Sequence, residues 1–319
     1  MKNAPAVLIF IFTALAVCAQ TPPNFTGIQR LTNREMLLRL SAPTGQNYRI
    51  DASTNLPEWQ PFLTLSSTGL NQHTDTAAPY LNRRYYRAQQ LSANVITGDH
   101  LVTTNGDVVI HPITHASFVM IWNGLIIYND PDSPTSLYTG LPKADLILIS
   151  HDHGDHFDTN ALHILTNTTT LIIAPQLVYN MMGTSLRALT RVLTNNTTTN
   201  VLGMRIDAIP AWNPTYHPQG RGNGYVLTIG GRRIYMAGDT GDIAEMRALT
   251  NIDVAFVCIN SPFTMTVSQA VSAVRQFRPR VVYPYHFRNG DNITFADLNA
   301  FKQQVGSDVG VEVRIRKWY

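Results

Sequence analysis

The chain has 319 residues, of which 44% are hydrophobic and 14% charged, a globular composition with enough apolar material for a core. The length suits one large domain with a small one, or two medium domains. The formal net charge is only +3 and no dense run of Lys or Arg occurs. The composition therefore gives no reason to expect binding to nucleic acid or to an anionic membrane surface.

The first 19 residues have the pattern of a secretory signal peptide. Lys2 precedes an apolar stretch from Ala6 to Val17, and Ala19 is a small residue where a signal peptidase would cleave. The stretch is too short to span a membrane stably, and no later segment reaches the length of a transmembrane helix. We expect residues 1–19 to be removed from a bacterial protein that is secreted or periplasmic. A lipoprotein anchored at Cys18 and a buried N-terminal helix are the alternatives.

Only two cysteines occur, Cys18 and Cys258. If the leader is removed after Ala19, a single thiol remains and no disulfide can form within the chain. Cys258 lies in the apolar run 254–259, which predicts a buried strand. We therefore interpret it as a structural thiol without a redox role.

Residues 24–91 are expected to form a small all-β domain. Segments rich in strand formers lie at 36–40, 48–52 and 84–88, separated by Pro, Gly, Asn and Ser. The region resembles the immunoglobulin-like or fibronectin-like domains added to secreted bacterial enzymes. It contains no cluster of His, Cys or carboxylates, so we assign it no chemistry. We expect a catalytic domain starting near Ser92 to work without it.

From about residue 96 the pattern changes to strands and helices. Three hairpins are predicted, with turns at Asn105-Gly106, Asn123-Gly124 and Gly230-Gly231 that supply the required positive φ. The apolar runs 146–149 and 281–283 predict strands that are covered on both faces. This order fits two β-sheets flanked by helices, an α/β fold.

Five helices are predicted between these strands, and a capping box of Thr266 and Gln269 opens the fourth of them. The predicted helices span 160–165, 176–182, 243–249, 267–277 and 295–305. The Asn- and Thr-rich stretches 167–170 and 194–200 are expected to be polar loops.

The strongest motif follows the predicted strand at 145–150. His151, His153, Asp155 and His156 fall within six residues on the loop that leaves this strand. Imidazole nitrogens and carboxylate oxygens are ligands of zinc and other divalent ions. A loop at a strand end can turn these side chains toward one point, which neither a straight strand nor a helix can do at this spacing. The motif therefore predicts a metal site, and the alternative is a solvated polar turn.

With this motif, residues 98–319 resemble the metallo-β-lactamase superfamily, whose hallmark is H-x-H-x-D-H. Later elements match in order, because Asp239 and His286 each follow a predicted strand. Asp130-Pro131 matches the dipeptide that precedes the metal loop in the superfamily. The resemblance implies an αββα sandwich over residues 96–319.

Two further pieces resemble the branch of the superfamily that contains the ascorbate-phosphate lactonases. One is His115-Ala116-Ser117, which matches an H-x-S motif, and the other is Phe263-Thr264-Met265-Thr266 in front of a helix. These pieces favour a lactone among the substrates that the fold accepts.

The resemblance implies two divalent metal ions. The first would be held by His151, His153 and His217, the second by Asp155, His156 and His286, and Asp239 would bridge them. Zinc is the default for a site rich in His, while manganese or iron would fit the carboxylate share. Asp155, Asp239 and His115 are the candidate catalytic residues.

His217 is the least obvious ligand, because it lies in a polar, Gly-rich stretch that predicts a loop before the third hairpin. It takes the third position because it lies between the metal loop and Asp239, as the superfamily order demands. His115 and His111 are the competitors, and a loop histidine that binds nothing is the plain alternative. His115 is otherwise expected to support a ligand, to face the substrate or to be structural.

The expected function is that of a secreted hydrolase in which a metal-bridged hydroxide attacks a small ester-type substrate. Asp155 could orient that hydroxide or move its proton, and no separate Ser or Cys nucleophile is needed. The expected partner is a small-molecule substrate, with lactone favoured. A phosphodiesterase of the same fold, and a secreted metal-binding or adhesion protein without turnover, are the alternatives.

Overall fold

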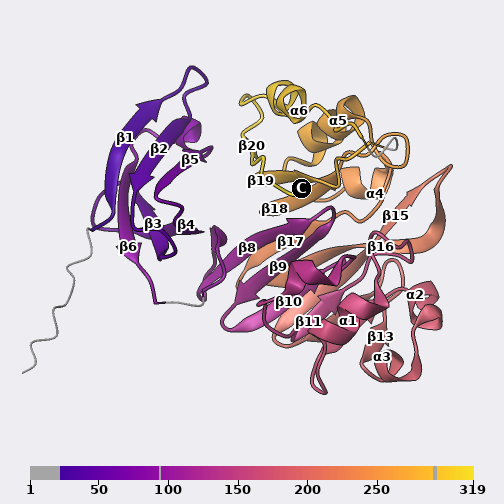
Figure 1. Ribbon diagram of the computed structural model, residues 1–319. Coiled ribbons are helices and arrows are strands. Elements are labelled where there is room, and N and C mark those ends of the chain that lie inside the picture. The colour runs from indigo at the N-terminus through magenta and orange to yellow at the C-terminus, as the bar shows by residue number, and fades with distance from the viewer. Residues whose placement is uncertain (1–21, 93–94, 290–292) are drawn as a thin grey trace, which may run out of the picture.

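The computed structural model describes residues 22–92, 95–289 and 293–319, so the predicted leader and Cys18 lie outside the described residues. The described chain forms a small β-domain beside a larger domain of sheets and helices (Figure 1). Within these residues, no helix combines the length and the apolar character needed to cross a membrane.

The small β-domain is built from six strands. They are β1 (Asn24–Arg30), β2 (Met36–Ser41), β3 (Asn47–Ser53), β4 (Gln60–Ser66), β5 (Leu70–Asp75) and β6 (Tyr85–Gln90). A three-stranded sheet in the order β1-β2-β5 packs on the strands β4-β3-β6. Leu38, Leu40, Tyr48, Ile50 and Phe62 are buried between them. The three strands predicted here coincide with β2, β3 and β6 to within two residues.

The large domain contributes the remaining strands. The first sheet contains β7 (Gly98–Val102), β8 (Asp107–Thr114), β9 (Ser117–Trp122), β10 (Leu125–Asn129), β11 (Leu146–Leu148), β12 (Leu171–Ala174) and β13 (Thr190–Val192). The second contains β14 (Thr198–Val201), β15 (Met204–Asn213), β16 (His217–Ile229), β17 (Arg232–Met236), β18 (Val254–Cys258), β19 (Val281–Tyr285) and β20 (Glu312–Val313). All three predicted hairpins are present, as the pairs β7–β8, β9–β10 and β16–β17.

The helices of the large domain cover the outer faces of both sheets (Figure 1). They are α1 (Thr159–Leu165), α2 (Gln176–Met181), α3 (Thr184–Ala188), α4 (Ala244–Arg247), α5 (Val267–Phe277), α6 (Leu298–Val305) and the 3₁₀ helix η2 (Thr135–Tyr138). A second 3₁₀ helix, η1 (Ala78–Tyr80), belongs to the small β-domain. The helix predicted at 267–277 is confirmed as α5, including its capping box.

The alternation of side chains along each strand separates two apolar layers. Leu146 and Leu148 in β11 belong to the core between the two sheets, whereas Ile147 and Ile149 belong to the core under α1, α2 and α3. Because successive strand residues point to opposite faces, a continuous apolar run is required where both faces are covered. The layers are therefore helix, sheet, sheet and helix, the αββα sandwich that the resemblance implied.

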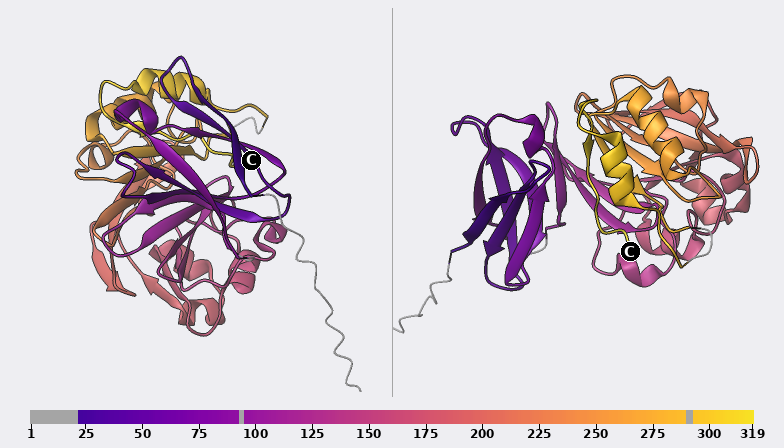
Figure 2. Two further views of the ribbon diagram at one scale, coloured as in Figure 1. Left: turned by 90° about the vertical axis from the view of Figure 1, so that its left-hand side faces the viewer. Right: turned by 90° about the horizontal axis from the view of Figure 1, so that it is seen from above.

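The two domains share one sheet. Strand β4 of the small β-domain pairs with β7 of the large domain, through Leu63 with Asp99 and Thr64 with Gly98. The resulting sheet has ten strands and runs from β13 to β6. Figure 2 shows the two domains side by side, joined across this seam. The small β-domain thus extends the first sheet of the large domain and also forms a sandwich of its own.

Three details differ from the expectation. The stretch 194–200, expected to be a loop, contains the start of the edge strand β14, in which only Val201 is buried. Helix α6 begins at Leu298 rather than at 295, because the Asp297 side chain caps its first turn. His217 lies at the start of the long strand β16 and not in a loop.

Candidate metal centre

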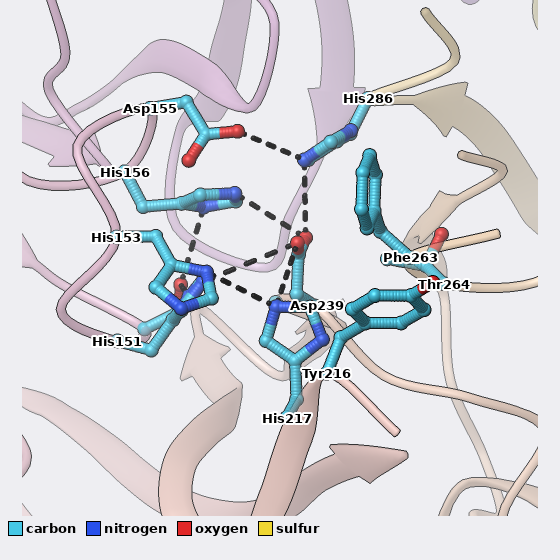
Figure 3. A network of polar contacts seen from close by, with 12 residues as sticks. His151, His153, Asp155, His156, Tyr216, His217, Asp239, Phe263, Thr264 and His286 are labelled. Carbon is cyan, nitrogen blue, oxygen red and sulfur yellow. Dashed lines mark hydrogen bonds and ion pairs between the residues drawn. The ribbon is translucent and has the colours of Figure 1, made fainter. Parts of the chain in front are cut away.

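The predicted ligands gather where loops from both sheets of the sandwich meet (Figure 3). The motif loop that begins at His151 follows β11 of the first sheet. In the second sheet, Asp239 follows β17, His286 follows β19, and His217 starts β16 at the same end. Ends of strands fix the direction of these side chains, because the backbone leading to each is held in a sheet.

Asp239 lies in the middle of the group. Its Oδ2 atom is 3.3 Å from His217 Nε2 and 4.0 Å from His151 Nε2. Its Oδ1 atom is 3.3 Å from His156 Nε2 and 3.3 Å from His286 Nε2. The two carboxylate oxygens therefore face two different pairs of imidazoles, which is the arrangement expected of a bridging carboxylate.

The group of His151, His156 and Asp239 shares one residue with each of two further groups of potential ligand atoms. One group consists of His151, His153 and His217. The other consists of His115, Asp155, His156 and His286. The first group is the set that the resemblance implied for one ion, and the second contains the set implied for the other ion together with His115.

The chemistry of these atoms fits divalent cations. The Nε2 atoms of His151, His156 and His286 and the Oδ1 atom of Asp239 are buried and have no hydrogen-bond partner among the described residues. Each such atom costs about 1–3 kcal/mol if nothing binds it. Ligand atoms about 2.0–2.1 Å from a tetrahedral ion lie about 3.3 Å from one another. The spacing of 3.3–4.0 Å around Asp239 is close to this value.

The outer ring nitrogens of two ligands are held by acceptors. His156 Nδ1 lies 2.9 Å from Asp130 Oδ2, and His151 Nδ1 lies 3.0 Å from the Ser150 hydroxyl oxygen. The Ser150 hydroxyl in turn donates to Asp130 over 2.8 Å. A hydrogen on Nδ1 leaves the lone pair of Nε2 free for a metal ion, and it also sets the orientation of the ring.

The Nδ1 atoms of His286 and His217 each lie beside the side-chain amide of an asparagine, and only one of these amides can turn its oxygen toward the ring. Asn260 Nδ2 lies 3.0 Å from His286 Nδ1, and the buried Asn260 oxygen has no partner, so turning this amide over satisfies both groups. Asn213 Nδ2 lies 2.7 Å from His217 Nδ1, while its oxygen already accepts two backbone N–H groups. This arrangement favours a hydrogen on Nε2 of His217, so the geometry supports His217 less than the other ligands.

His115 lies against the second group. Its Nε2 atom is 2.9 Å from Asp155 Oδ2, and its Nδ1 atom is 2.6 Å from the Tyr319 hydroxyl. Its ring centroid is 3.7 Å from that of His286. Burial and the nearby His286 lower the pKa of His115 to about 4. His115 is therefore neutral at pH 7 and holds the Asp155 carboxylate through this contact.

The charges of the cluster prepare it for a cation. Burial opposes ionisation of Asp239, but His286 and His156 outweigh it and hold the pKa of Asp239 well below its usual range. Burial lowers the pKa of His151 well below its usual value. For His286, burial is outweighed by Asp239 and Asp155, and the pKa rises to about 8. Ionised carboxylates bind metal ions, and the field that attracts a proton to His286 also attracts a metal ion.

The backbone around the cluster adopts conformations that are uncommon outside glycine. His115, Asp130 and His286 have positive φ values of 52°, 41° and 46°. Such conformations concentrate at functional sites, where the surrounding structure imposes them. The Ser117 hydroxyl lies 2.9 Å from Asp132 Oδ1 and also contacts the Asp130 carbonyl, which ties the turn carrying His115 to the loop carrying Asp130.

A cleft of about 400 Å³ opens onto the cluster. The rings of Tyr216 and Phe263 meet edge to face at 4.8 Å and form one wall, as Figure 3 shows. Thr215 and Asn260 add polar groups to the lining. None of the described residues that line this cleft is Lys or Arg.

Sequence reasoning missed the residues that support the ligands. Asn260 could have been predicted as a site residue, because it is a polar residue that directly follows the apolar run 254–259. Asp152 within the motif pairs with Arg221 through two hydrogen bonds of 2.8 and 2.7 Å, which clamp the loop to β16. Tyr319 carried no signal, since nothing in its neighbourhood of the sequence points to the cluster.

A family model described as a β-lactamase superfamily domain matches residues 109–286, more than half of the chain. Together with the αββα layers and the ligand cluster, this match shows that the chain belongs to the metallo-β-lactamase superfamily. Within that superfamily it is a metal-dependent hydrolase, as the relatives indicate.

Three similar proteins cover between 53% and 70% of this chain. A UPF0173 metal-dependent hydrolase of Thermococcus onnurineus is 35% identical over 176 residues, which cover 53% of this chain and 78% of that protein. A crystal structure from Parabacteroides distasonis, of a protein assigned as a metal-dependent hydrolase, is 39% identical with a TM-score of 0.63 and covers 70% of this chain and 100% of that one. Igni18, a metallo hydrolase of Ignicoccus hospitalis, is 28% identical with a TM-score of 0.57 and covers 66% of this chain and 95% of that one.

Proposed function

We propose that this protein hydrolyses a small, uncharged carboxylic ester, with a lactone favoured, and that it uses two divalent metal ions. The observation that carries this proposal is the cleft beside the ligand cluster, which has an aromatic wall and no Lys or Arg among its described lining residues. A phosphodiester keeps a negative charge that only the metal ions, and no Lys or Arg of this lining, would neutralise, whereas a lactone or simple ester carries none. The resemblance of His115-Ala116-Ser117 to a lactonase motif favours a lactone among the carboxylic esters.

The ligand cluster divides between the two ions. One ion would be held by His151, His153 and His217, the other by Asp155, His156 and His286, with Asp239 between them. Divalent ions bound in this way lower the pKa of water and polarise the oxygen of the scissile carbonyl group. Asp155 is 48% exposed in its side chain and can exchange a proton with the cleft, while His115 keeps its carboxylate in place.

The walls of the cleft would choose and orient the substrate. Tyr216 and Phe263 offer ring surface to an apolar or planar portion of the ester. The Thr215 hydroxyl can donate a hydrogen bond to a ring oxygen or a neighbouring hydroxyl of the substrate. A cleft of about 400 Å³ suits a substrate of small-molecule size.

A substrate panel with a common organic portion tests the proposal. The panel would contain a lactone, an aryl ester, an aryl phosphodiester and a β-lactam, each measured with the purified full-length protein. We expect the lactone or ester to give the highest kcat/KM, with activity lost after chelation and restored by added metal. A phosphodiester that gives the highest kcat/KM would overturn the choice of substrate. Metal binding without turnover of any member would instead favour a metal-binding or adhesion protein.

The aromatic wall can be tested by variants in the same assay. Phe263→Ala should lower kcat/KM for an aryl ester by about tenfold and leave metal content unchanged, because one good aromatic contact contributes about 0.5–1.5 kcal/mol beyond its area. Leu177→Ala on α2, an exposed apolar residue away from the cleft, is the matched control. Equal losses in the two variants would contradict a role for the wall.

Metal analysis of the purified protein tests the number and identity of the ions. We expect two ions per chain, and zinc as the preferred metal because most of the ligands are imidazoles. Manganese or iron in place of zinc would change the identity but keep the ligand set. A single ion per chain would contradict the bridging role of Asp239.

Export is a separate proposal, which rests on the leader pattern of residues 1–19. The mature chain should start near Gln20 or Thr21 in the periplasm or the medium. N-terminal sequencing checks this, and a lipid on Cys18 would select the anchored form instead. Exported protein that retains Met1 would contradict cleavage.

A further inference from the structure

The segment Glu312–Tyr319 runs from the small β-domain to the candidate metal centre. At one end, the Thr76 hydroxyl donates to Glu312 over 2.5 Å, and the Tyr80 hydroxyl donates over 2.7 Å to the backbone carbonyl just before Glu312. Both donors belong to the small β-domain. At the other end, the Tyr319 hydroxyl lies 2.6 Å from His115 Nδ1.

The middle of this segment is held as firmly as its ends. Arg316 Nε donates to the buried carboxylate of Asp99 over 2.8 Å. Trp318 is almost completely buried, and its ring lies edge-on to Phe118 and Phe256 with centroid distances of 5.9 and 6.2 Å. The small β-domain therefore holds the start of this segment, the large domain holds its middle, and the position of Tyr319 depends on both.

The hydrogen-bond chemistry at Tyr319 has a defined direction. An ionised carboxylate only accepts hydrogen bonds, so His115 Nε2, 2.9 Å from Asp155 Oδ2, carries the ring hydrogen. The lone pair of Nδ1 is then free to accept the Tyr319 hydroxyl. Burial raises the pKa of Tyr319, so the phenol remains a donor. The chain of donors therefore runs from Tyr319 to His115 and from His115 to Asp155.

We propose that Tyr319 is a positioning residue, which acts through His115 on Asp155, and that the small β-domain holds it in place through the segment Glu312–Tyr319. The inference rests on the function proposed above, because orienting Asp155 affects turnover only if the cluster performs the hydrolysis. It assigns a role in the active site to the domain that carries no ligand of its own.

Tyr319→Phe in the full-length protein tests the direct contact, since it removes only the hydroxyl. In the metal-free protein, ¹⁵N NMR of His115 should show the Nε2–H tautomer for the wild type and a mixture of tautomers for the variant. In the metal-loaded protein, kcat for an ester should fall by about tenfold with little change in KM and in metal content. Tyr179→Phe on α2 is the control and should match the wild type. An unchanged tautomer and an unchanged kcat would overturn the role of Tyr319.

Thr76→Val tests the contribution of the small β-domain, because it removes one hydrogen bond at the far end of the segment. The matched control is Thr170→Val, which also removes a buried hydroxyl, one that donates to the Ala144 carbonyl over 2.6 Å. Thr76→Val should shift the His115 NMR signals and lower kcat in the same direction as Tyr319→Phe, but less. If both threonine variants leave His115 and kcat unchanged, the small β-domain has no part in positioning.

The two proposals fail in different ways. If the wild type hydrolyses no ester, the proposed function fails, whereas the NMR measurement on His115 still decides whether Tyr319 and the small β-domain set its tautomer. If the wild type is active but His115 does not respond to Tyr319→Phe, only the positioning role fails.

Discussion

Two of the groups of buried charged side chains in this protein differ in how their charges are paired. At the junction of the domains, Asp99 accepts hydrogen bonds of 2.7 Å from Tyr283 and 2.8 Å from Arg316, and Glu312 accepts one of 2.7 Å from Arg314. In the metal centre, by contrast, four buried ligand atoms around Asp239 have no partner among the described residues.

The difference shows what each group is for. Two carboxylates and two guanidinium groups at the junction balance one another in charge, although Nη2 of Arg316 is buried without a hydrogen-bond partner among the described residues. This network serves the packing of the domains. The metal centre collects carboxylates and imidazoles whose unpaired atoms face one another, and a bound cation would satisfy them. Changes in the metal centre should therefore affect metal binding and turnover, and changes at the junction should affect the free energy of unfolding.

The largest effect should come from Asp239→Asn. This change removes the charge that faces both sets of imidazoles, so we expect loss of both metal ions and a fall of about a thousandfold in kcat/KM. Metal analysis together with the ester assay measures this result. Asp253→Asn is the matched control, because Asp253 is a buried carboxylate just before β18, at the opposite end of the strands, where it pairs with Arg232. Loss of metal in the control as well would break the comparison.

The second prediction separates the two candidates for the third imidazole of the first ion. His217→Ala should remove most of one metal ion per chain and lower activity by at least about a hundredfold, because a catalytic zinc ion keeps three protein ligands. His115→Ala should leave both ions bound, although turnover falls. If His115→Ala loses an ion and His217→Ala keeps two, the assignment is reversed. The contact of Asn213 Nδ2 with His217 Nδ1 would then explain why His217 does not bind the metal ion.

The sequence predicted the structure best where a short pattern of residue types occurs in few other structural settings. The ligand motif could be read from His151 to His156 because His and Asp at that spacing on a loop have few other functions. The capping box of Thr266 and Gln269 located the start of α5, and Asn-Gly or Gly-Gly located the hairpin turns. In each case a local pattern determined the local structure.

The sequence was less informative where distant segments decide the structure. The stretch after His217 is rich in Gly and predicts a loop, yet it is strand β16, because Gly222 packs against the metal loop. A Cβ atom on Gly222 would lie 3.3 Å from the Cβ atom of His151. The pairing of β4 with β7, which joins the domains, involves two residue pairs and leaves no pattern in the sequence. The expectation that a chain starting near Ser92 is active stays a prediction, and such a chain would lack the contacts of Thr76 and Tyr80 with the segment Glu312–Tyr319.

The third prediction concerns pH and the junction. Burial, followed by the charges of Arg316 and Arg314, lowers the pKa of His73 to about 4, although the carboxylates of Asp99 and Asp75 act in the opposite direction. Between pH 6.5 and 4 the unfolded chain therefore binds more protons at this residue than the folded chain, and stability falls as the pH falls. The loss attributable to His73 is about 3 kcal/mol by pH 4.

Urea unfolding of the wild type and of His73→Phe, compared between pH 7 and pH 4, measures this contribution. The comparison must be a difference between the two proteins. Burial raises the pKa of Asp132 to about 7, which changes stability in the opposite direction over the same range. The variant should lose less stability on acidification than the wild type, and identical pH profiles would contradict the prediction.

The smallest effect should come from the ion pair of Lys302 with Glu35, which also links the two domains. The Glu35 side chain is only 7% exposed, whereas that of Lys302 is 26% exposed. Glu35→Gln leaves a lysine that can extend into water, so it should cost about 1 kcal/mol or less. Lys302→Met leaves a buried carboxylate without its cation and should cost more, about 1–3 kcal/mol. Urea unfolding at pH 7 measures both variants, and metal content should stay unchanged in each. Equal costs would mean that the Glu35 carboxylate reaches water when Lys302 is replaced, and would contradict the prediction that this carboxylate stays buried.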